Sequence, residues 1–255
     1  MEIIGIVGYG VVGNATARML KSTAEILIQD PEKGYQANLK RCDYIFICIN
    51  EKSVNMKNLE DVIEEIDRTN QKATIIIRTT VIPGTTDKFI EKYNRDIVFM
   101  PEFLREWNVK EDARSPDKIV IGTIKHELFL EIKNLLWNIE IDDNRILQTK
   151  PIEAEMAKLA LNSLALIKVV FAEELYDLAN VMGADYQSIY TIFELDQNVN
   201  KRHLLAKKDN YRGADGKCLP KDTDFLIKIG EEKSRMALLE TARILNNLYL
   251  KVREQ

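Results

Sequence analysis

A glycine pattern close to the N-terminus is the feature that most constrains the fold of this chain. Gly8, Gly10 and Gly13 have the spacing G-x-G-x-x-G and directly follow the apolar run at residues 3–7. Between a strand and a helix, the first glycine makes a tight turn, the second lets a pyrophosphate approach the backbone, and the third allows close helix–strand packing. The free N–H groups of the helix that follows would attract the phosphates. The predicted cofactor-binding residues of this loop are Gly8, Gly10, Val11, Val12 and Gly13. The alternative is a turn that only needs small residues.

An acidic residue stands where such a site needs one. Asp30 ends the second strand-like run, twenty residues after Gly10. A carboxylate there accepts a hydrogen bond from a ribose 2′-hydroxyl and repels a 2′-phosphate, so we expect NAD rather than NADP.

The first 150 residues alternate apolar runs with helical segments. The runs at 24–29, 44–49, 74–77, 97–100 and 118–121 are continuous and rich in Ile and Val. Strands buried on both faces have this composition, which predicts a parallel sheet covered by helices. We therefore expect an α/β fold, with a Rossmann-type domain over residues 1–150.

The pattern changes after Pro151. Residues 152–182 contain no helix breaker and predict one long helix, and further helices are expected near 185–193, 221–229 and 233–252. Residues 151–255 should form an all-helical domain. Because the long helix is apolar around much of its circumference, we expect a homodimer built on residues 152–182.

Composition excludes several classes of protein. With 40 acidic and 36 basic residues the net charge is −4, which argues against a nucleic-acid-binding protein. No run reaches the roughly 18 apolar residues of a membrane span. The N-terminus enters a strand without a signal peptide, and three cysteines suit neither a disulfide framework nor a zinc site. A cytoplasmic globular protein without a metal is expected.

One cysteine lies in an unusual setting. Cys218 stands between Lys217 and Leu219-Pro220-Lys221-Asp222, where a glycine-containing loop enters a helix. Two lysines and a helix N-terminus would lower the pKa of its thiol and favour the nucleophilic thiolate. Asp222 could orient a water or take a proton. The alternative is a cysteine chosen only for its size.

Polar residues also interrupt the apolar long helix. Lys158 and Asn162 are four residues apart and share a helix face. An ammonium and an amide placed together could stabilise a developing oxyanion. The alternative is a structural ion pair between Lys158 and Glu155.

Two segments follow predicted strands, at the carboxyl ends where open α/β sheets bind ligands. One is the run at 78–85, Arg-Thr-Thr-Val-Ile-Pro-Gly-Thr, and the other is Pro101-Glu102-Phe103-Leu104-Arg105-Glu106. The second supplies the paired carboxylates Glu102 and Glu106. The alternative is that both are turns with solvated acids.

Together these segments resemble the UDP-glucose/GDP-mannose dehydrogenase family, in the same order and at similar spacing over nearly the whole chain. The matching pieces are the glycine loop, residues 79–85, residues 101–106, Glu153 to Lys158 with Asn162, and residues 218–222. The resemblance implies oxidation of the C6 primary alcohol of a nucleotide sugar to a carboxylate, with two NAD per sugar and no metal.

The resemblance also implies residue roles. Cys218 would form a thiohemiacetal and then a thioester, while Lys158 and Asn162 stabilise oxyanions. Asp222 and Thr80 would hold a water that helps to move protons, and Glu106 and Glu102 would assist hydrolysis. Implied cofactor contacts include Thr80, Glu106 and Lys221. Implied substrate contacts are Glu102, Phe103, Leu104, Lys158, Asn162 and Cys218.

The chain departs from the family in two places. Only residues 31–42 separate Asp30 from Asp43, where relatives have a longer helical insert, and we expect the C-terminal nucleotide-binding domain to be absent. Two alternatives therefore stay open. One is an NAD-binding protein with reduced catalysis, or one that needs a partner chain. The other is a β-hydroxyacid-type dehydrogenase with a catalytic lysine and no need for Cys218.

Overall fold

The computed structural model describes residues 1–105, 107–206, 211–216 and 218–252, which form two compact units, Met1–Lys158 and Leu159–Gln255. Unit 1 contains an eight-stranded sheet in the order β3-β2-β1-β4-β5-β6-β7-β8. The strands are β1 (Glu2–Val7), β2 (Ala24–Asp30), β3 (Tyr35–Gln36), β4 (Tyr44–Ile47), β5 (Thr74–Ile77), β6 (Ile97–Phe99), β7 (Ile119–Gly122) and β8 (Ile146–Thr149). The division between the units falls inside a helix, eight residues after the domain boundary expected near 150.

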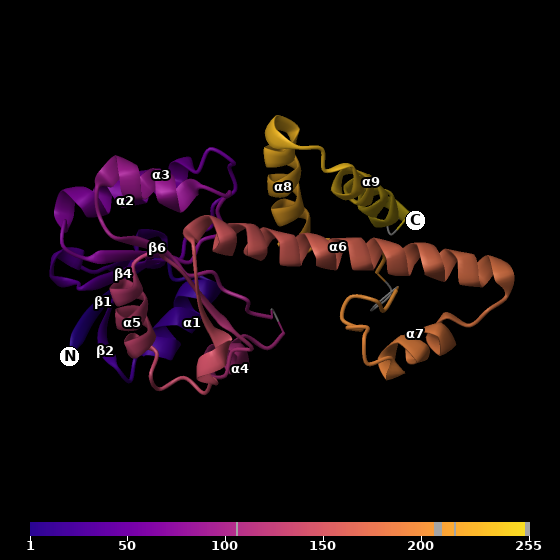
Figure 1. Ribbon diagram of the computed structural model, residues 1–255, viewed down its shortest axis with the longest axis horizontal. Coiled ribbons are helices and arrows are strands. Elements are labelled where there is room, and N and C mark those ends of the chain that lie inside the picture. The colour runs from indigo at the N-terminus through magenta and orange to yellow at the C-terminus, as the bar shows by residue number, and fades with distance from the viewer. Residues whose placement is uncertain (106, 207–210, 217, 253–255) are drawn as a thin grey trace. The chain divides into compact units, whose positions relative to one another are not determined.

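Helices cover both faces of the sheet (Figure 1). Helices α1 (Val11–Leu20) and α5 (His126–Leu135) share one hydrophobic core with Ile4, Phe46 and Ile76. Helices α2 (Lys57–Thr69) and α3 (Thr85–Tyr93) lie on the other face, and α4 (Val109–Arg114) packs beside α1. Both faces are buried, as the continuous apolar runs predicted.

The expectation of a parallel sheet needs two corrections. β2 pairs with β3, and β6 pairs with β7, in antiparallel fashion. β8, which the sequence analysis did not predict, joins the edge parallel to β7. Apolar composition reports that a strand is buried but carries no information about its direction, and β8 is a half-exposed edge strand with a weak apolar signal.

The short connection between β2 and β4 is held by one buried amide. It contains only two 3-10 turns, at Pro31–Lys33 and Leu39–Arg41, and the two-residue β3. The Asn70 side chain donates hydrogen bonds to the carbonyl oxygens of Leu39 and Cys42 at 2.8 and 2.9 Å, and accepts from the N–H groups of Lys72 and Ala73. This single side chain therefore links the connection before β4 to the turn before β5.

Replacing Asn70 should destabilise unit 1 strongly. In Asn70→Ala the two carbonyl groups and two N–H groups lose their partner, and the Cys42 carbonyl and the Ala73 N–H lose it at buried positions. We expect the free energy of unfolding to fall by about 2–4 kcal/mol in urea titrations. Asn58→Ala, at an exposed position on α2, is the matched control and should change stability by less than about 0.5 kcal/mol. Equal stability of the two variants would contradict this account.

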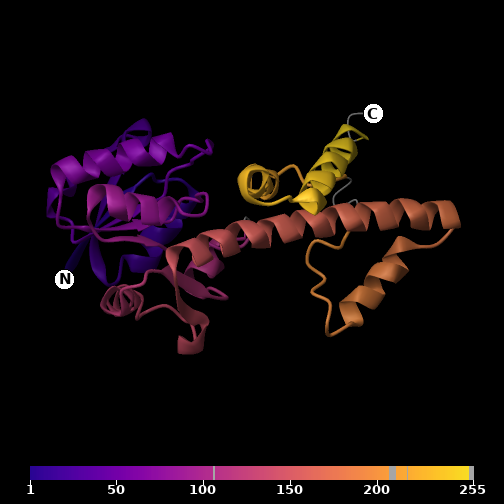
Figure 2. The ribbon, with the colours of Figure 1, turned by 45° about the horizontal axis from the view of Figure 1, so that its top comes forward.

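Unit 2 is helical. It consists of the larger part of α6 (Pro151–Met182) with α7 (Tyr186–Leu195), α8 (Leu219–Lys233) and α9 (Ala237–Val252). Figures 1 and 2 show α7 on one side of α6, and α8 and α9 on the other. Each side has its own apolar cluster, one centred on Leu166 and Ala242 and one on Ala172 and Tyr186.

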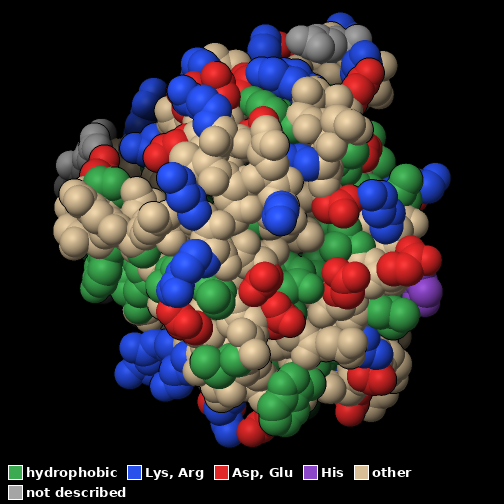
Figure 3. Space-filling model, turned by 90° about the vertical axis from the view of Figure 1, so that its left-hand side faces the viewer, with side chains coloured by type: hydrophobic (Ala, Val, Ile, Leu, Met, Phe, Trp, Pro, Cys, Tyr) green, Lys and Arg blue, Asp and Glu red, His purple; other side chains and the backbone are tan. Residues whose placement is uncertain are grey.

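The surface carries both signs of charge. Basic and acidic side chains are interspersed over the face shown in Figure 3. None of the helices in the described ranges is both long enough and apolar enough to cross a membrane.

Candidate active site

The glycine loop has the geometry that its spacing predicts. Gly8 has a φ of 85°, and a Cβ there would lie 2.9 Å from the carbonyl oxygen of Cys48. A Cβ on Gly13 would lie 2.0 Å from the carbonyl oxygen of Gly8, so only glycine allows α1 to pack this close to β1. A Cβ on Gly10 would meet nothing within 4 Å. The close approaches at Gly8 and Gly13 explain why these two positions need glycine. The open side of Gly10 leaves room for a ligand.

The surroundings of the loop fit a dinucleotide. α1 begins with no capping side chain and no acidic residue in its first turn, so its N-terminal N–H groups face no competing anion of their own helix. Asp30 accepts the Tyr9 N–H at 2.7 Å through Oδ2, and Lys33 donates to the Tyr9 carbonyl. Asp30 thus orders the glycine loop through one of its two carboxylate oxygens.

A buried ion pair follows β6. The Lys158 ammonium donates to the Glu102 carbonyl oxygen at 2.7 Å and to its carboxylate at 2.9 Å, and the Leu104 N–H donates to the same carboxylate at 2.7 Å. Burial alone would raise the pKa of Glu102, but Lys158, these hydrogen bonds and the nearby Arg78 outweigh it and hold the pKa below 4.5. Glu102 is therefore a fixed, ionised carboxylate.

Glu155 is not the partner of Lys158, which corrects that alternative. Its carboxylate accepts hydrogen bonds from the Gly84 N–H at 2.6 Å, the Thr86 N–H at 2.8 Å and the Thr86 hydroxyl at 2.6 Å. Burial raises the pKa of Glu155 despite these bonds. The first turn of α6 thereby holds the segment after β5, where Thr80 lies half-buried.

A second polar contact lies one helical turn further along α6, inside unit 2. The Asn162 amide donates to Oδ2 of the fully buried Asp222 at 2.6 Å. The Lys221 ammonium lies 3.1 Å from Oδ1 of the same carboxylate. Lys158 and Asn162, both on α6, therefore each bind a carboxylate from another part of the chain. These two partners were not predicted from the sequence.

Cys218 is the residue before α8, at its N-terminal cap, and is exposed. The loop that precedes it is fixed from two helices. Asn246 of α9 bonds both the N–H and the carbonyl of Ala214, at 2.7 and 2.9 Å. Glu173 of α6 accepts from the Gly213 N–H at 3.1 Å and from the Arg212 guanidinium. Asn246 and Glu173 were not predicted from the sequence, although a polar residue inside an apolar helix was a usable signal.

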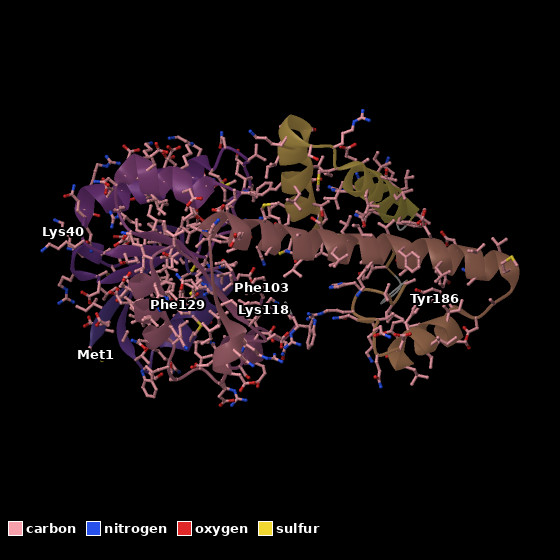
Figure 4. The ribbon with its side chains drawn as sticks, in the orientation of Figure 1. Met1, Lys40, Phe103, Lys118, Phe129 and Tyr186 are labelled. Carbon is pink, nitrogen blue, oxygen red and sulfur yellow. The ribbon has the colours of Figure 1, made fainter. Side chains whose placement is uncertain are left out.

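The other predicted residues have simpler surroundings. The Phe103 ring has the ammonium groups of Lys118 and Lys158 at 4.3 and 5.4 Å from its centre, and Figure 4 shows Phe103 and Lys118 side by side. Glu106 and Lys217 lie outside the described residues. Within the described ranges, no three His, Cys, Asp or Glu side chains are grouped so as to hold a metal ion.

The Glu102–Lys158 pair should make stability depend on pH. Glu102→Gln leaves the Lys158 ammonium without its counter-ion, which should cost about 3 kcal/mol at pH 7 in urea titrations. Because the pKa of Glu102 is lowered in the folded chain, its contribution is present above pH 4.5 and is lost as the pH falls through the folded value. The difference in the free energy of unfolding between the wild type and Glu102→Gln should therefore become smaller below pH 4.5.

The matched control for this pair is Glu111→Gln, because Glu111 forms an exposed ion pair with Arg114. We expect that variant to follow the wild type closely at every pH. An advantage of the wild type over Glu102→Gln that stays constant down to pH 3 would contradict the assignment.

Comparisons with known proteins agree with the two-part organisation. The family model for the UDP-glucose/GDP-mannose dehydrogenase NAD binding domain matches residues 29–139, and the model for the central domain matches residues 152–248. A UDP-glucose 6-dehydrogenase of Bacillus subtilis is 28% identical over 244 residues, which are 90% of this chain and 54% of that protein. One from Rickettsia bellii is 30% identical over 199 residues, 74% of this chain and 45% of that protein.

Solved structures share the fold. A UDP-glucose dehydrogenase from Pyrobaculum islandicum superimposes with a TM-score of 0.84 at 22% identity, covering 97% of this chain and 68% of its own. A UDP-D-ManNAc dehydrogenase from Pyrococcus horikoshii gives a TM-score of 0.80 at 20% identity, covering 96% and 68%. The chain spans about half the length of the curated relatives it matches.

Proposed function

Because the chain belongs to the UDP-glucose/GDP-mannose dehydrogenase family and carries its NAD-binding domain, we propose that it oxidises the C6 primary alcohol of a nucleotide sugar to a carboxylate. Residues 1–150 would bind NAD, and residues 151–255 would contribute to substrate binding and dimerisation. The observation that carries the proposal is the pair of buried contacts on α6, Lys158 with Glu102 and Asn162 with Asp222.

The glycine loop would hold the cofactor. The backbone N–H groups of Val11 and Val12 would face the pyrophosphate past the open side of Gly10, and the second oxygen of Asp30 would accept a ribose hydroxyl. Bound NAD would supply the hydride acceptor for each of the two oxidations. Thr80, Glu106 and Lys221 are further proposed cofactor contacts.

Cys218 would be the nucleophile. After the alcohol has lost a hydride and a proton, the thiolate adds to the aldehyde carbon and gives a thiohemiacetal. Loss of a second hydride and a proton leaves a thioester, and water then cleaves the C–S bond, releasing the carboxylate and restoring the thiol. The position at the start of α8 favours the thiolate, because the helix N-terminus stabilises negative charge.

The Lys158 ammonium and the Asn162 amide are held in place, and each still has an N–H donor that is not used in these contacts. Lys158 has three N–H donors and uses two of them on Glu102, while Asn162 has two and uses one on Asp222. Each keeps one donor for an oxyanion that forms at C6. Asp222 and Thr80 would hold a water for proton movement, and Glu102 and Glu106 would assist thioester hydrolysis. Phe103 and Leu104 would contact the substrate.

Counting NADH against sugar tests the proposal directly. We expect two NADH for each UDP-glucose, GDP-mannose or N-acetylated relative that is consumed, with the product a uronate. Cys218→Ala should lower turnover by about 10³-fold or more, because the thioester cannot form. Cys42→Ala, which removes a buried thiol, is the control and should keep its activity.

The other outcomes identify the alternatives. NAD binding by calorimetry without turnover on any nucleotide sugar would indicate a binding protein, or an enzyme that needs a partner chain. Oxidation of a small hydroxy acid that persists in Cys218→Ala would indicate a β-hydroxyacid-type dehydrogenase. The same proposal puts the enzyme in the cytoplasm, where free thiols are kept reduced.

We also propose a homodimer through residues 152–182. On α6, Leu164, Phe171 and Leu178 recur every seven residues and are each about half exposed, at 54%, 49% and 56%. Residues seven apart share a helix face, so these side chains form one apolar stripe of the kind that packs against a second helix.

A charge on that stripe should separate the subunits. Phe171→Glu should give the mass of a monomer by size-exclusion chromatography with light scattering, where the wild type gives a dimer. Leu195→Glu is the control, because Leu195 is 78% exposed on α7, away from the stripe, and this variant should remain dimeric. A monomeric wild type would refute the proposal.

A further inference from the structure

Unit 1 contains a small cavity beside the proposed substrate contacts Glu102, Phe103 and Leu104, which form part of its wall. Its volume is about 40 Å³, and its walls come from α1, the end of β5, the segment 100–104 and residues of the segment 112–119. A site for one water needs about 10–15 Å³, so this space suits a few waters or one small ion and is too small for a nucleotide or a sugar.

A buried guanidinium with two unpartnered donor atoms lines this cavity. Arg78 is 6% exposed, and its Nε and Nη1 atoms have no hydrogen-bond partner among the described residues. Burial costs a guanidinium several kcal/mol unless its charge and its donors are matched. Glu102 is near enough for its charge to act on Arg78, but the Nε and Nη1 donors of the guanidinium still lack acceptors in the described structure.

The carboxylates around the cavity are already engaged. Glu102 is held by Lys158 and the Leu104 N–H, and Asp112 accepts hydrogen bonds from the Arg105 guanidinium and its backbone N–H. The remaining charged residues of the lining are the exposed Asp117 and Lys118, whose ammonium lies over the Phe103 ring. None of the described carboxylates forms an ion pair with Arg78 by side-chain distance.

We propose that this cavity is a binding site for one small monovalent anion, of the size of chloride, nitrate or formate, with the Arg78 guanidinium as its main ligand. The anion would match the buried charge and occupy space that is otherwise left to water. Arg78 opens the segment after β5 and Glu102 lies in the segment after β6, so a bound anion would tie these two segments together. Unit 1 should therefore gain stability when the anion binds.

Thermal unfolding of the full chain tests this site. Sodium nitrate is added up to about 200 mM, with the ionic strength kept constant by sodium gluconate, whose anion is too large for the cavity. We expect a saturable rise of about 2–4 °C in the Tm of the wild type and no rise in Arg78→Met. Arg95→Met is the control: the Arg95 side chain is also largely buried, but its guanidinium bonds Asp67 and the Ala73 carbonyl, so this variant should keep the nitrate response.

A second variant keeps the test decisive if Arg78→Met does not fold. Ala113→Leu retains the arginine but fills the cavity, because Ala113 is a buried part of its wall. The wild type should broaden the ³⁵Cl NMR line of added chloride, nitrate should reverse the broadening, and Ala113→Leu should show neither effect. Absence of nitrate-reversible broadening in the wild type, or its persistence in Ala113→Leu, would overturn the proposal.

Discussion

The polar contacts along one helix are the constraint on which the rest of the structure depends. Within about two turns of α6, Glu155 binds the segment after β5, Lys158 binds Glu102, and Asn162 binds Asp222. Each contact involves a carboxylate whose side chain is largely buried, so each is costly to break and specific in geometry. Glu155 and Lys158 thus fix the start of α6 within unit 1, and Asn162 fixes α8 within unit 2.

Most of the fold was predictable because it follows from patterns of local chemistry. Three sequence patterns each favour one structure: the glycine spacing, the continuous buried strands and the unbroken apolar helix. Strand direction at β6 and β7, and the edge strand β8, were not predictable, because pairing depends on contacts distant in sequence. The short connection before β4 was visible as a missing insert, but its dependence on Asn70 was not.

The candidate site shows the same division. The sequence singled out Lys158, Asn162, Cys218 and Asp222 by residue type, and the structure shows Lys158, Asn162 and Asp222 in hydrogen bonds between side chains. Their partners were assigned less well: Glu155 was named as the counter-ion of Lys158, since it is near in sequence, whereas Glu102 comes from another strand end. Long-range partners need a fold before they can be named. Arg78 illustrates this, because nothing in its sequence context distinguishes a buried guanidinium from a solvated one.

The double hydrogen bond between Asn246 and Ala214 has a consequence for how the protein is made. The backbone around Ala214 is fixed by a residue that the ribosome adds 32 positions later. Until that asparagine has been synthesised, the loop before Cys218 lacks the two hydrogen bonds that fix its backbone, so this loop can take its final conformation only after α9 has begun to form.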